Sequence, residues 1–284
     1  MKLKKLVALV SSAILAFSLV GCSIEGEENG ASSDGSLVGN GSIGFSVSTL
    51  NNPFFVTLSQ GAKDKAKEEG RDLIVVDAGD DAAKQTSDIE DLISKNISVL
   101  IVNPVDSDAV APAVKDAIAK GIKVISLDRA VNGVDVDCSI ASDNVEGARM
   151  ATEYLVSLVG KDAKVVELEG TSGSSATIDR GAGFHKIADD QLNVVSSQTA
   201  NFNRSEGMTV MENMLQSNSD IKGVFAHNDE MALGAVEAIG SKNIIVVGFD
   251  STDDALAAIK KGKMAATVAQ KPDLMGATAV ETAI

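Results

Sequence analysis

Polar side chains follow five apolar runs of this sequence, at the point where each run ends. The runs are SIGFSVS (42–48), SVLIVNP (98–104), KVISLDR (123–129), GVFAHND (223–229) and IIVVGFD (244–250), and the side chains are Ser48, Asn103, Asp128, Arg129, Asn228 and Asp250. Because a helix-like segment follows each run, we expect the runs to form parallel strands. Ligands of open parallel sheets bind beyond the carboxyl ends of the strands. The sequence therefore predicts a crevice lined by hydrogen-bonding groups, suited to a small, hydroxyl-rich ligand.

Ten strand-like runs recur along the chain, and segments with helical periodicity separate most of them. The runs cover about 42–48, 72–77, 97–102, 122–127, 138–141, 163–168, 192–197, 222–226, 244–248 and 264–269. The first helix has a clear start signal, since Asn52 can cap its N-terminus and Pro53 stands at its first position. This alternation predicts an α/β fold with two Rossmann-like lobes, each built on a parallel sheet.

The alternation of strands and helices breaks at two places, which we interpret as crossings of the chain between the lobes. The breaks lie around 138–143 and 269–272. We therefore expect 41–141 plus about 271–284 to form the N-terminal lobe and 142–270 to form the C-terminal lobe. The crossings would act as a hinge, and the crevice between the lobes is the predicted site.

The first 40 residues predict export and membrane anchoring. Residues 1–21 combine lysines with an apolar stretch over 6–20, which is typical of a signal peptide and too short for a transmembrane helix. The end of this segment resembles a bacterial lipobox, in which Cys22 is diacylated; ordinary cleavage is the alternative. Residues 22–40 are rich in Gly, Ser, Glu and Asn and are expected to be a flexible tether. We expect a lipid-anchored protein on the extracytoplasmic face of the cell membrane.

Charge and motif content argue against several classes of function. Removing the leader changes the formal net charge from −15 to −18, because the leader holds three lysines and no acids. This charge argues against nucleic acid binding. The sequence has no dinucleotide fingerprint, phosphate loop or nucleophile elbow, and its two histidines lack metal-ligand spacing. We therefore expect no enzymatic activity, no cofactor and no metal. Cys138 is expected to be a buried small hydrophobe.

Six motifs together resemble the D-ribose-binding proteins, a family with the type I periplasmic-binding-protein fold that serves ABC sugar importers. The motifs are STLNNPFF (48–55), NPVDSDAV (103–110), LDRA (127–130), IASDN (140–144), NDEMALGA (228–235) and VVGFD (246–250). They occur in order over almost all of 42–284. The resemblance implies capture of D-ribose or a related sugar between two lobes and its delivery to an ABC permease. We expect a monomer.

The resemblance, carried over position by position, assigns ligand contacts to both lobes. The N-terminal lobe would supply Ser48, Asn52, Phe54, Phe55, Asn103, Asp128 and Arg129, the other lobe Arg180, Phe202, Asn228, Phe249 and Asp250, and the crossings Ser142 and Gln270. Phenyl rings suit the apolar face of a sugar, and charged groups form strong hydrogen bonds with hydroxyls. Core packing of the rings, surface ion pairs, and helix capping by Asn228 or Asp250 are the alternatives.

The chain also departs from the pattern of the family. Thr177 and Ile178 stand where the family typically has a small residue and a second arginine. His227 stands where many relatives have glutamine, and it is either a neighbour that tunes the pocket or a satisfied histidine behind it. His185 is expected to face solvent on a helix. Relatives continue after the segment equivalent to 281–283 with the rest of a helix, a loop and a final strand.

Two other readings remain. Another sugar or furanose-like ligand, such as allose or a cyclic signalling molecule, would keep the transport role. A sugar-sensing regulator domain is more remote, because such regulators carry a basic helix-turn-helix where this chain has a signal, a cysteine and an acidic tether.

Overall fold

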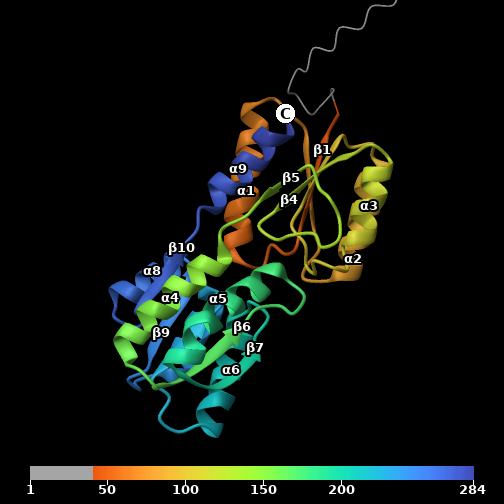
Figure 1. Ribbon diagram of the computed structural model, residues 1–284. Coiled ribbons are helices and arrows are strands. Elements are labelled where there is room, and N and C mark those ends of the chain that lie inside the picture. Colours follow the sequence, from red (N-terminus) through yellow and green to blue (C-terminus); the bar gives the residue numbers. More distant parts are fainter. Residues whose placement is uncertain (1–40) are drawn as a thin grey trace, which may run out of the picture. The chain divides into compact units, whose positions relative to one another are not determined.

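The computed structural model describes residues 41–284, which form two parallel sheets flanked by helices (Figure 1). The expected signal peptide (1–21), Cys22 and the rest of the tether lie outside the described residues. Within the described part, ten strands and nine helices succeed one another. Each of the ten predicted runs overlaps one of these strands, so the α/β fold with two parallel-sheet lobes is confirmed.

The first sheet has the strand order β2-β1-β3-β4-β5, and all neighbouring strands are parallel. Its lobe contains β1 (Ile43–Val47), α1 (Pro53–Glu68), β2 (Leu73–Asp77), α2 (Ala82–Ser94), β3 (Val99–Val102), α3 (Ala111–Ala119), β4 (Lys123–Leu127), β5 (Cys138–Ile140) and α9 (Pro272–Ala283). Helices α1 and α9 pack on one face, and α2 and α3 on the other. Strands β1 and β3 are buried along their whole length, because both faces of the sheet are covered.

The second sheet has the order β10-β9-β8-β6-β7 and is also parallel throughout. Its lobe contains α4 (Asn144–Val159), β6 (Lys164–Glu169), α5 (Ser175–Gln191), β7 (Asn193–Thr199), α6 (Arg204–Ser217), β8 (Gly223–Ala226), α7 (Asp229–Ile239), β9 (Ile245–Asp250), α8 (Asp253–Lys260) and β10 (Ala266–Ala269). Helices α4 and α5 share one core with the sheet, and α6, α7 and α8 share the other.

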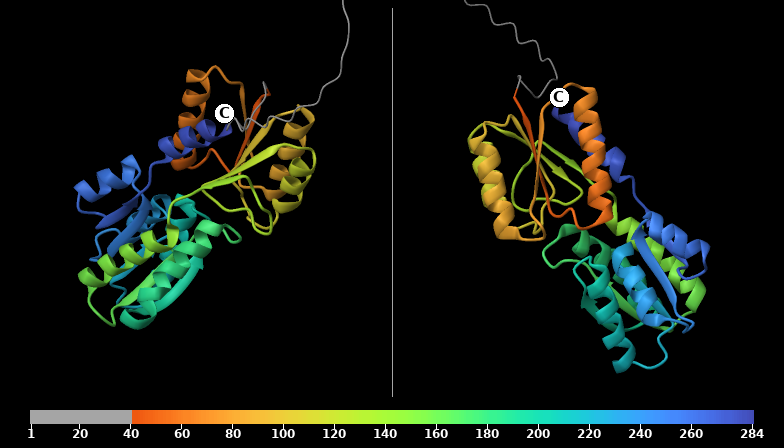
Figure 2. Two further views of the ribbon diagram at one scale, coloured as in Figure 1. Left: turned by 45° about the horizontal axis from the view of Figure 1, so that its top comes forward. Right: turned by 180° about the vertical axis from the view of Figure 1, so that it is seen from behind.

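Helix α9 returns to the first sheet and packs along α1, as both views of Figure 2 show. The two helices approach closely because each of them presents a glycine to the backbone of the other. A Cβ on Gly61 would lie 2.1 Å from the carbonyl oxygen of Asp273, and one on Gly276 would lie 2.0 Å from that of Leu58. The last helix is therefore part of the first lobe's core.

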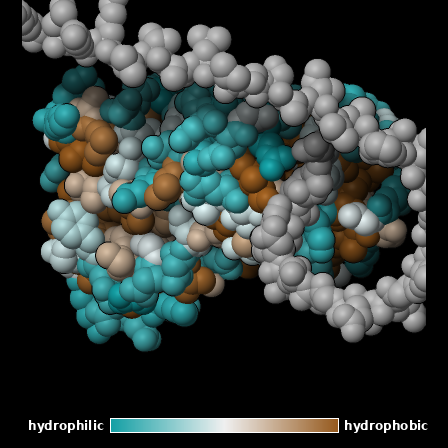
Figure 3. Space-filling model, turned by 90° about the horizontal axis from the view of Figure 1, so that it is seen from above, coloured by the Kyte–Doolittle hydropathy of each residue, from teal (hydrophilic) through white to brown (hydrophobic). Residues whose placement is uncertain are grey.

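The surface of the described part is mainly hydrophilic in the view of Figure 3, with smaller hydrophobic areas between the polar side chains. None of the helices within 41–284 has both the length and the apolar content needed to cross a bilayer. Cys138, expected to be buried, is only partly buried, because β5 lies at the edge of its sheet.

Candidate ligand-binding site

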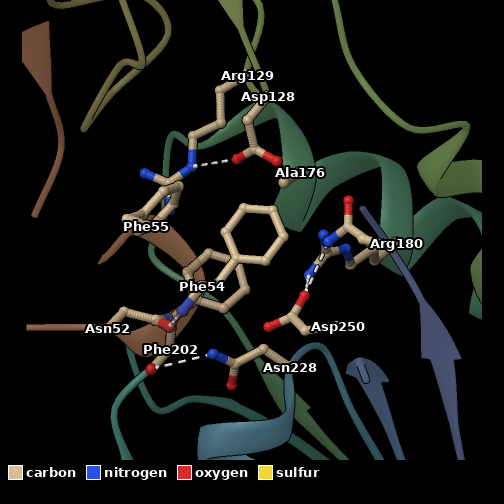
Figure 4. A pocket seen from close by; sticks show the side chains of 11 residues that line it. Asn52, Phe54, Phe55, Asp128, Arg129, Ala176, Arg180, Phe202, Asn228 and Asp250 are labelled. Carbon is tan, nitrogen blue, oxygen red and sulfur yellow. Dashed lines mark hydrogen bonds and ion pairs between the residues drawn. The ribbon is translucent and has the colours of Figure 1, made fainter. Parts of the chain in front are cut away.

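A pocket lies between the two lobes, beyond the carboxyl ends of both sheets (Figure 4). It is lined by Asn52, Phe54, Phe55, Asp128, Arg129, Ala176, Arg180, Phe202, Asn228, Asp250 and Gln270. Most of these residues directly follow a strand or lie in the first turns of a helix. The position of this pocket suits a small ligand held by both lobes.

Two pairs of an acid and an arginine form the charged part of the pocket. Nε of Arg129 lies 3.8 Å from Oδ2 of Asp128, and Nη1 of Arg180 lies 3.7 Å from Oδ1 of Asp250. None of the four residues is more than 6 % exposed. Because two positive charges face two negative ones, the pocket buries charged groups without burying a net charge.

Burial controls the pKa of these four groups. It raises the pKa of Asp128 and Asp250 and lowers the pKa of Arg129 and Arg180, because removal from water disfavours the charged forms. The opposite charges nearby act against this shift in every case. Hydrogen bonds from a polar ligand would stabilise the same charged forms further.

The charged groups keep capacity for additional hydrogen bonds. The separations within the two pairs exceed the roughly 2.7–3.2 Å of a hydrogen bond, and the buried Nε of Arg129 has no hydrogen-bond partner among the described residues. Other nitrogens fix the guanidiniums in place. Nη1 of Arg129 donates to the carbonyl oxygen of Pro104 (2.8 Å), while Arg180 donates to Oδ1 of Asn144 (2.9 Å) and to the carbonyl oxygen of His227 (2.5 Å). Both guanidiniums are thus anchored from behind.

Phenylalanine rings from both lobes border the pocket. Phe54 and Phe55 meet edge to face, with ring centroids 5.2 Å apart. The guanidinium of Arg129 lies 5.0 Å from the ring centre of Phe55 and 5.3 Å from that of Phe202, so it is flanked by rings of both lobes. These cation–π contacts hold the arginine while the rings also supply an apolar wall.

Three lining residues adopt left-handed backbone conformations. The φ angles are +67° at Asp128, +56° at Phe202 and +119° at Asp250. Such angles are uncommon for residues other than glycine and concentrate at functional sites, where the surrounding structure imposes them. The chain therefore turns sharply at the pocket, directly after β4 and at the end of β9.

Comparison with known proteins identifies the family. The profile of the periplasmic binding protein domain matches residues 43–284. The chain belongs to the periplasmic binding protein family. The ribose import binding protein RbsB of Bacillus subtilis (strain 168) is 50% identical over 283 residues, which cover 99% of this chain and 92% of that protein. The family comprises extracytoplasmic substrate-binding proteins for transport, so the expectations of the resemblance and of no enzymatic activity are confirmed.

Solved structures of periplasmic binding proteins share the fold. The myo-inositol binding protein of Caulobacter, bound to myo-inositol, is 35% identical with a TM-score of 0.82, and the match covers 86% of each chain. A solute binding protein of Actinobacillus succinogenes 130z with bound D-allose is 33% identical with a TM-score of 0.78, over 86% of this chain and 90% of that one. The expected type I fold is therefore confirmed.

Of the fourteen residues predicted to contact ligand, ten line the pocket and four do not. The four are Ser48, Asn103, Ser142 and Phe249. The guanidinium of Arg180 lies 3.9 Å from the ring centre of Phe249, which supports it from behind. Oδ1 of Asn103 accepts from the Ser48 N–H (3.1 Å), and its Nδ2 donates to the carbonyl oxygen of Leu127 (3.1 Å). These side chains fix the ends of the strands that carry the lining.

Asn228 both lines the pocket and caps a helix, so the structure shows the predicted position and the capping alternative at once. Its Oδ1 accepts from the N–H of Met231 (2.9 Å) at the start of α7, and its Nδ2 donates to the carbonyl oxygen of Phe202 (3.2 Å). Asn52 caps α1 in the same way, accepting from the N–H of Phe54 (2.9 Å).

Ala176 is the lining residue that the sequence reasoning missed. It lies in the first turn of α5, which follows the small-residue run 171–175. A helix that begins directly after such a run can bring its N-terminus close to a ligand, so the run itself was the available signal. The small side chain leaves the space that the pocket occupies.

A buried carboxylate behind the pocket was also missed. Oε1 of Glu167 accepts from Nε2 of His227 (2.9 Å), and Oε2 accepts from Oγ of Ser197 (2.7 Å). Burial lowers the pKa of His227, and Nδ1 of the ring accepts from the Gly170 N–H (3.4 Å), so the neutral ring carries its proton on Nε2. His227 is therefore a satisfied histidine behind the pocket, and its carbonyl group holds Arg180.

His185 lies on α5 with 42 % of its side chain exposed, so it faces solvent in part, as expected. Its Nδ1 lies 2.8 Å from Oδ1 of Asp189, and its Nε2 lies 3.2 Å from Oε2 of Glu167. Across residues 41–284, no group of three or more His, Cys, Asp or Glu side chains is placed to hold a metal ion.

Proposed function

We propose that this protein captures D-ribose between its two lobes and delivers it to an ABC importer. The observation that carries the proposal is the buried, charge-balanced set of two carboxylates and two guanidiniums with free hydrogen-bonding capacity, bordered by phenyl rings of both lobes. The 50% identity to the ribose import binding protein of Bacillus subtilis supports ribose as the ligand.

The chemistry of the pocket matches a sugar. Hydroxyl groups donate to the carboxylates of Asp128 and Asp250 and accept from Arg129 and Arg180, which forms charge-assisted hydrogen bonds. The apolar face of the ring packs against the phenylalanines. A sugar that lacks one matching hydroxyl would leave a buried group unpaired, at a cost of about 1–3 kcal/mol. Selectivity among sugars follows from this cost.

The second candidate is the same transport role with another sugar or a furanose-like ligand. It is favoured by the solved relatives, whose bound ligands are myo-inositol and D-allose.

Binding is coupled to closure of the lobes in this proposal. The lobes are 41–141 with about 271–284, and 142–270, and the crossings around 138–143 and 269–272 form the hinge. The sugar contacts both lobes only when they are shut, so its greater affinity for that form drives closure. The permease then distinguishes the closed form from the open one.

We further propose that the protein is a monomer held at the outer face of the membrane by a lipid on Cys22. The lipobox-like sequence before Cys22 supports this anchor. The two or three acyl chains of such a terminus provide the two signals that stable anchoring needs.

Titration calorimetry and thermal melts of the full chain in mild detergent test the function. The panel is ribose, allose, galactose, glucose, xylose and myo-inositol. Ribose at about 100 times its Kd should add about 2.7 kcal/mol and raise Tm by about 5–10 °C. A response to another sugar alone would replace ribose by that sugar. A cooperative melt with no response to any member would contradict sugar binding.

A further inference from the structure

The two lobes are joined beside the pocket by direct hydrogen bonds around Ser107 and Ser175. Ser107, in the loop between β3 and α3, donates its N–H to the carbonyl oxygen of Gly173 (3.0 Å), and its Oγ accepts from the N–H of Ser175 (3.1 Å). Oγ of Ser175 in turn accepts from the N–H of Ala130 (2.9 Å), after β4. All three bonds connect one lobe to the other, and neither serine lines the pocket.

The approach of the lobes at this contact requires a glycine. Gly173 has φ of +83°, and a Cβ there would lie 2.1 Å from Oδ2 of Asp106 in the other lobe. The Asp106 side chain is held in place, since its Oδ1 accepts from the N–H groups of Asp108 and Ala109 (both 2.8 Å). The surfaces are thus built to fit closely at this point.

The contact also provides an unusual cap for α5. Ser174 is the N-cap residue of this helix, but its side chain makes no capping hydrogen bond, and its buried Oγ has no partner among the described residues. The N–H of Ser175, the first residue of the helix, donates to Ser107 of the opposite lobe, whereas an N-cap side chain would accept from the second or third helical residue. The exposed amides at a helix start need acceptors, so separation of the lobes would leave this one without its partner.

We propose that Ser107, Ser174 and Ser175 form an interlobe latch in which the partners of α5 are exchanged as the lobes open and close. In the closed form Ser107 accepts from α5, and Ser174 is left unpaired. In the open form Ser107 moves away, and the Ser174 hydroxyl caps the first turn of the same helix. The inference rests on the proposed hinge motion. The three serines are positioning residues, which set the balance between the forms and thereby the affinity for sugar without touching it.

Substitutions in the latch should change affinity in opposite directions. Ser107→Ala and Ser175→Ala each remove a hydroxyl that accepts an interlobe hydrogen bond in the closed form. Sugar binding should therefore weaken by roughly three- to tenfold. Ser174→Ala removes a hydroxyl that is satisfied only in the open form and unpaired when the lobes are closed. Binding should therefore tighten by a similar factor.

Calorimetry of the full chain with ribose, together with stopped-flow release rates, tests these signs. Ser98→Ala is the matched control, because Oγ of Ser98 donates to the carbonyl oxygen of Ser42 within one lobe (3.3 Å), at the amino ends of the strands. This control should leave affinity unchanged. Release should be faster in Ser107→Ala and slower in Ser174→Ala. Unchanged affinity in Ser107→Ala, or weaker binding in Ser174→Ala, would overturn the latch.

Hydrogen exchange without sugar separates failure of the latch from failure of the proposed function. The Ser107 N–H donates to Gly173, and Ser175→Ala leaves both of these groups intact. The Ser107 amide should nevertheless exchange faster in Ser175→Ala, because the lobes separate more often in that variant. It should exchange more slowly in Ser174→Ala, because the lobes separate less often there. If the wild-type chain bound no sugar, these rates would still decide the proposal, and equal rates in all variants would refute it.

Discussion

Ser142 donates a hydrogen bond of 2.6 Å to Oε1 of Gln270 and so links the two crossings of the chain to each other. The same glutamine reaches the pocket, since its Nε2 donates to Oδ1 of Asp250 (2.8 Å). One side chain therefore connects the proposed hinge to a charged group of the proposed sugar site. A movement of either crossing would displace this carboxylate.

We expect Gln270→Ala to weaken sugar binding by about tenfold or more, because a hydrogen bond to a charged group contributes about 1.5–3 kcal/mol. Ser142→Ala should have a smaller effect in the same direction. Calorimetry measures both. Gln60→Ala is the control, since Gln60 makes the same type of bond with Asp64 on the exposed face of α1 (2.8 Å). Equal affinity in Gln270→Ala and the control would contradict the proposed site.

Removing either pocket carboxylate should abolish sugar binding while the free protein stays folded. In Asp250→Asn the closed form would bury Arg180 without its partner, and a broken buried pair costs about 3–5 kcal/mol. The affinity should therefore fall at least about a hundredfold. The open form exposes these groups to water in the proposed motion, so the melting temperature without sugar should change little. Asp128→Ala should behave in the same way.

The control for the carboxylates is Asp108→Asn, which changes an exposed side chain outside the pocket. It should bind sugar as the wild type does. Near-native affinity in Asp250→Asn or Asp128→Ala would show that the pocket is wrongly assigned.

A larger side chain at position 176 should fill the pocket. Ala176 is 2 % exposed and lines the cavity from the first turn of α5, and leucine is a good helix former. We expect Ala176→Leu to lose measurable sugar binding with an unchanged or slightly higher Tm in the absence of sugar. Ala176→Ser should retain binding. Sugar binding by Ala176→Leu at wild-type strength would place the ligand elsewhere.

The contribution of His185 to stability should depend on pH. Burial acts to lower its pKa, but the hydrogen bond to Asp189 and the charge of Glu167 outweigh burial and raise the pKa above 6.5. The stabilisation is then complete below 6.5 and is lost as the pH rises through the raised folded-state pKa. Urea unfolding of His185→Gln should thus show a larger loss of stability at about pH 6 than at about pH 8.5.

Lys186→Gln, which changes the next residue of α5, is the control for this titration. The effect of Lys186→Gln on stability should be similar at the two pH values. A His185→Gln effect that is equal at both, or larger at the higher pH, would refute the pairing of protonated His185 with the two carboxylates.

The strand ends of the sequence predict four of the lining residues, and the family resemblance supplies six more. The four are Asp128, Arg129, Asn228 and Asp250. Asp128 and Asp250 directly terminate their apolar runs, and the rule for parallel sheets places such residues at one edge. Phe249 shows where this reasoning stops. Successive residues of a strand point to opposite faces, so with Asp250 directed into the pocket its neighbour Phe249 packs beside Gly147 of α4.

Contacts between distant segments were beyond prediction from one sequence. Glu167 lies inside β6, and a single acid in a strand is expected to face solvent. Its burial depends on His227 and Ser197, which belong to other elements. The bonds of Ser107 to the opposite lobe are of the same kind. No local pattern distinguishes a serine that caps a helix of another lobe from one that faces water.

The packing of α9 on α1 has a consequence for the order in which the protein folds during synthesis. Met275, Ala279 and Val280 complete the core that Phe54 and Leu58 begin, so the first lobe to be made is the last whose core is closed. The five strands of the second sheet, β6 to β10, lie in one continuous stretch, 164–269, which can fold before α9 has been synthesised. Until α9 has been synthesised, the apolar surface of the first lobe that α9 covers stays exposed, and a chaperone can bind it.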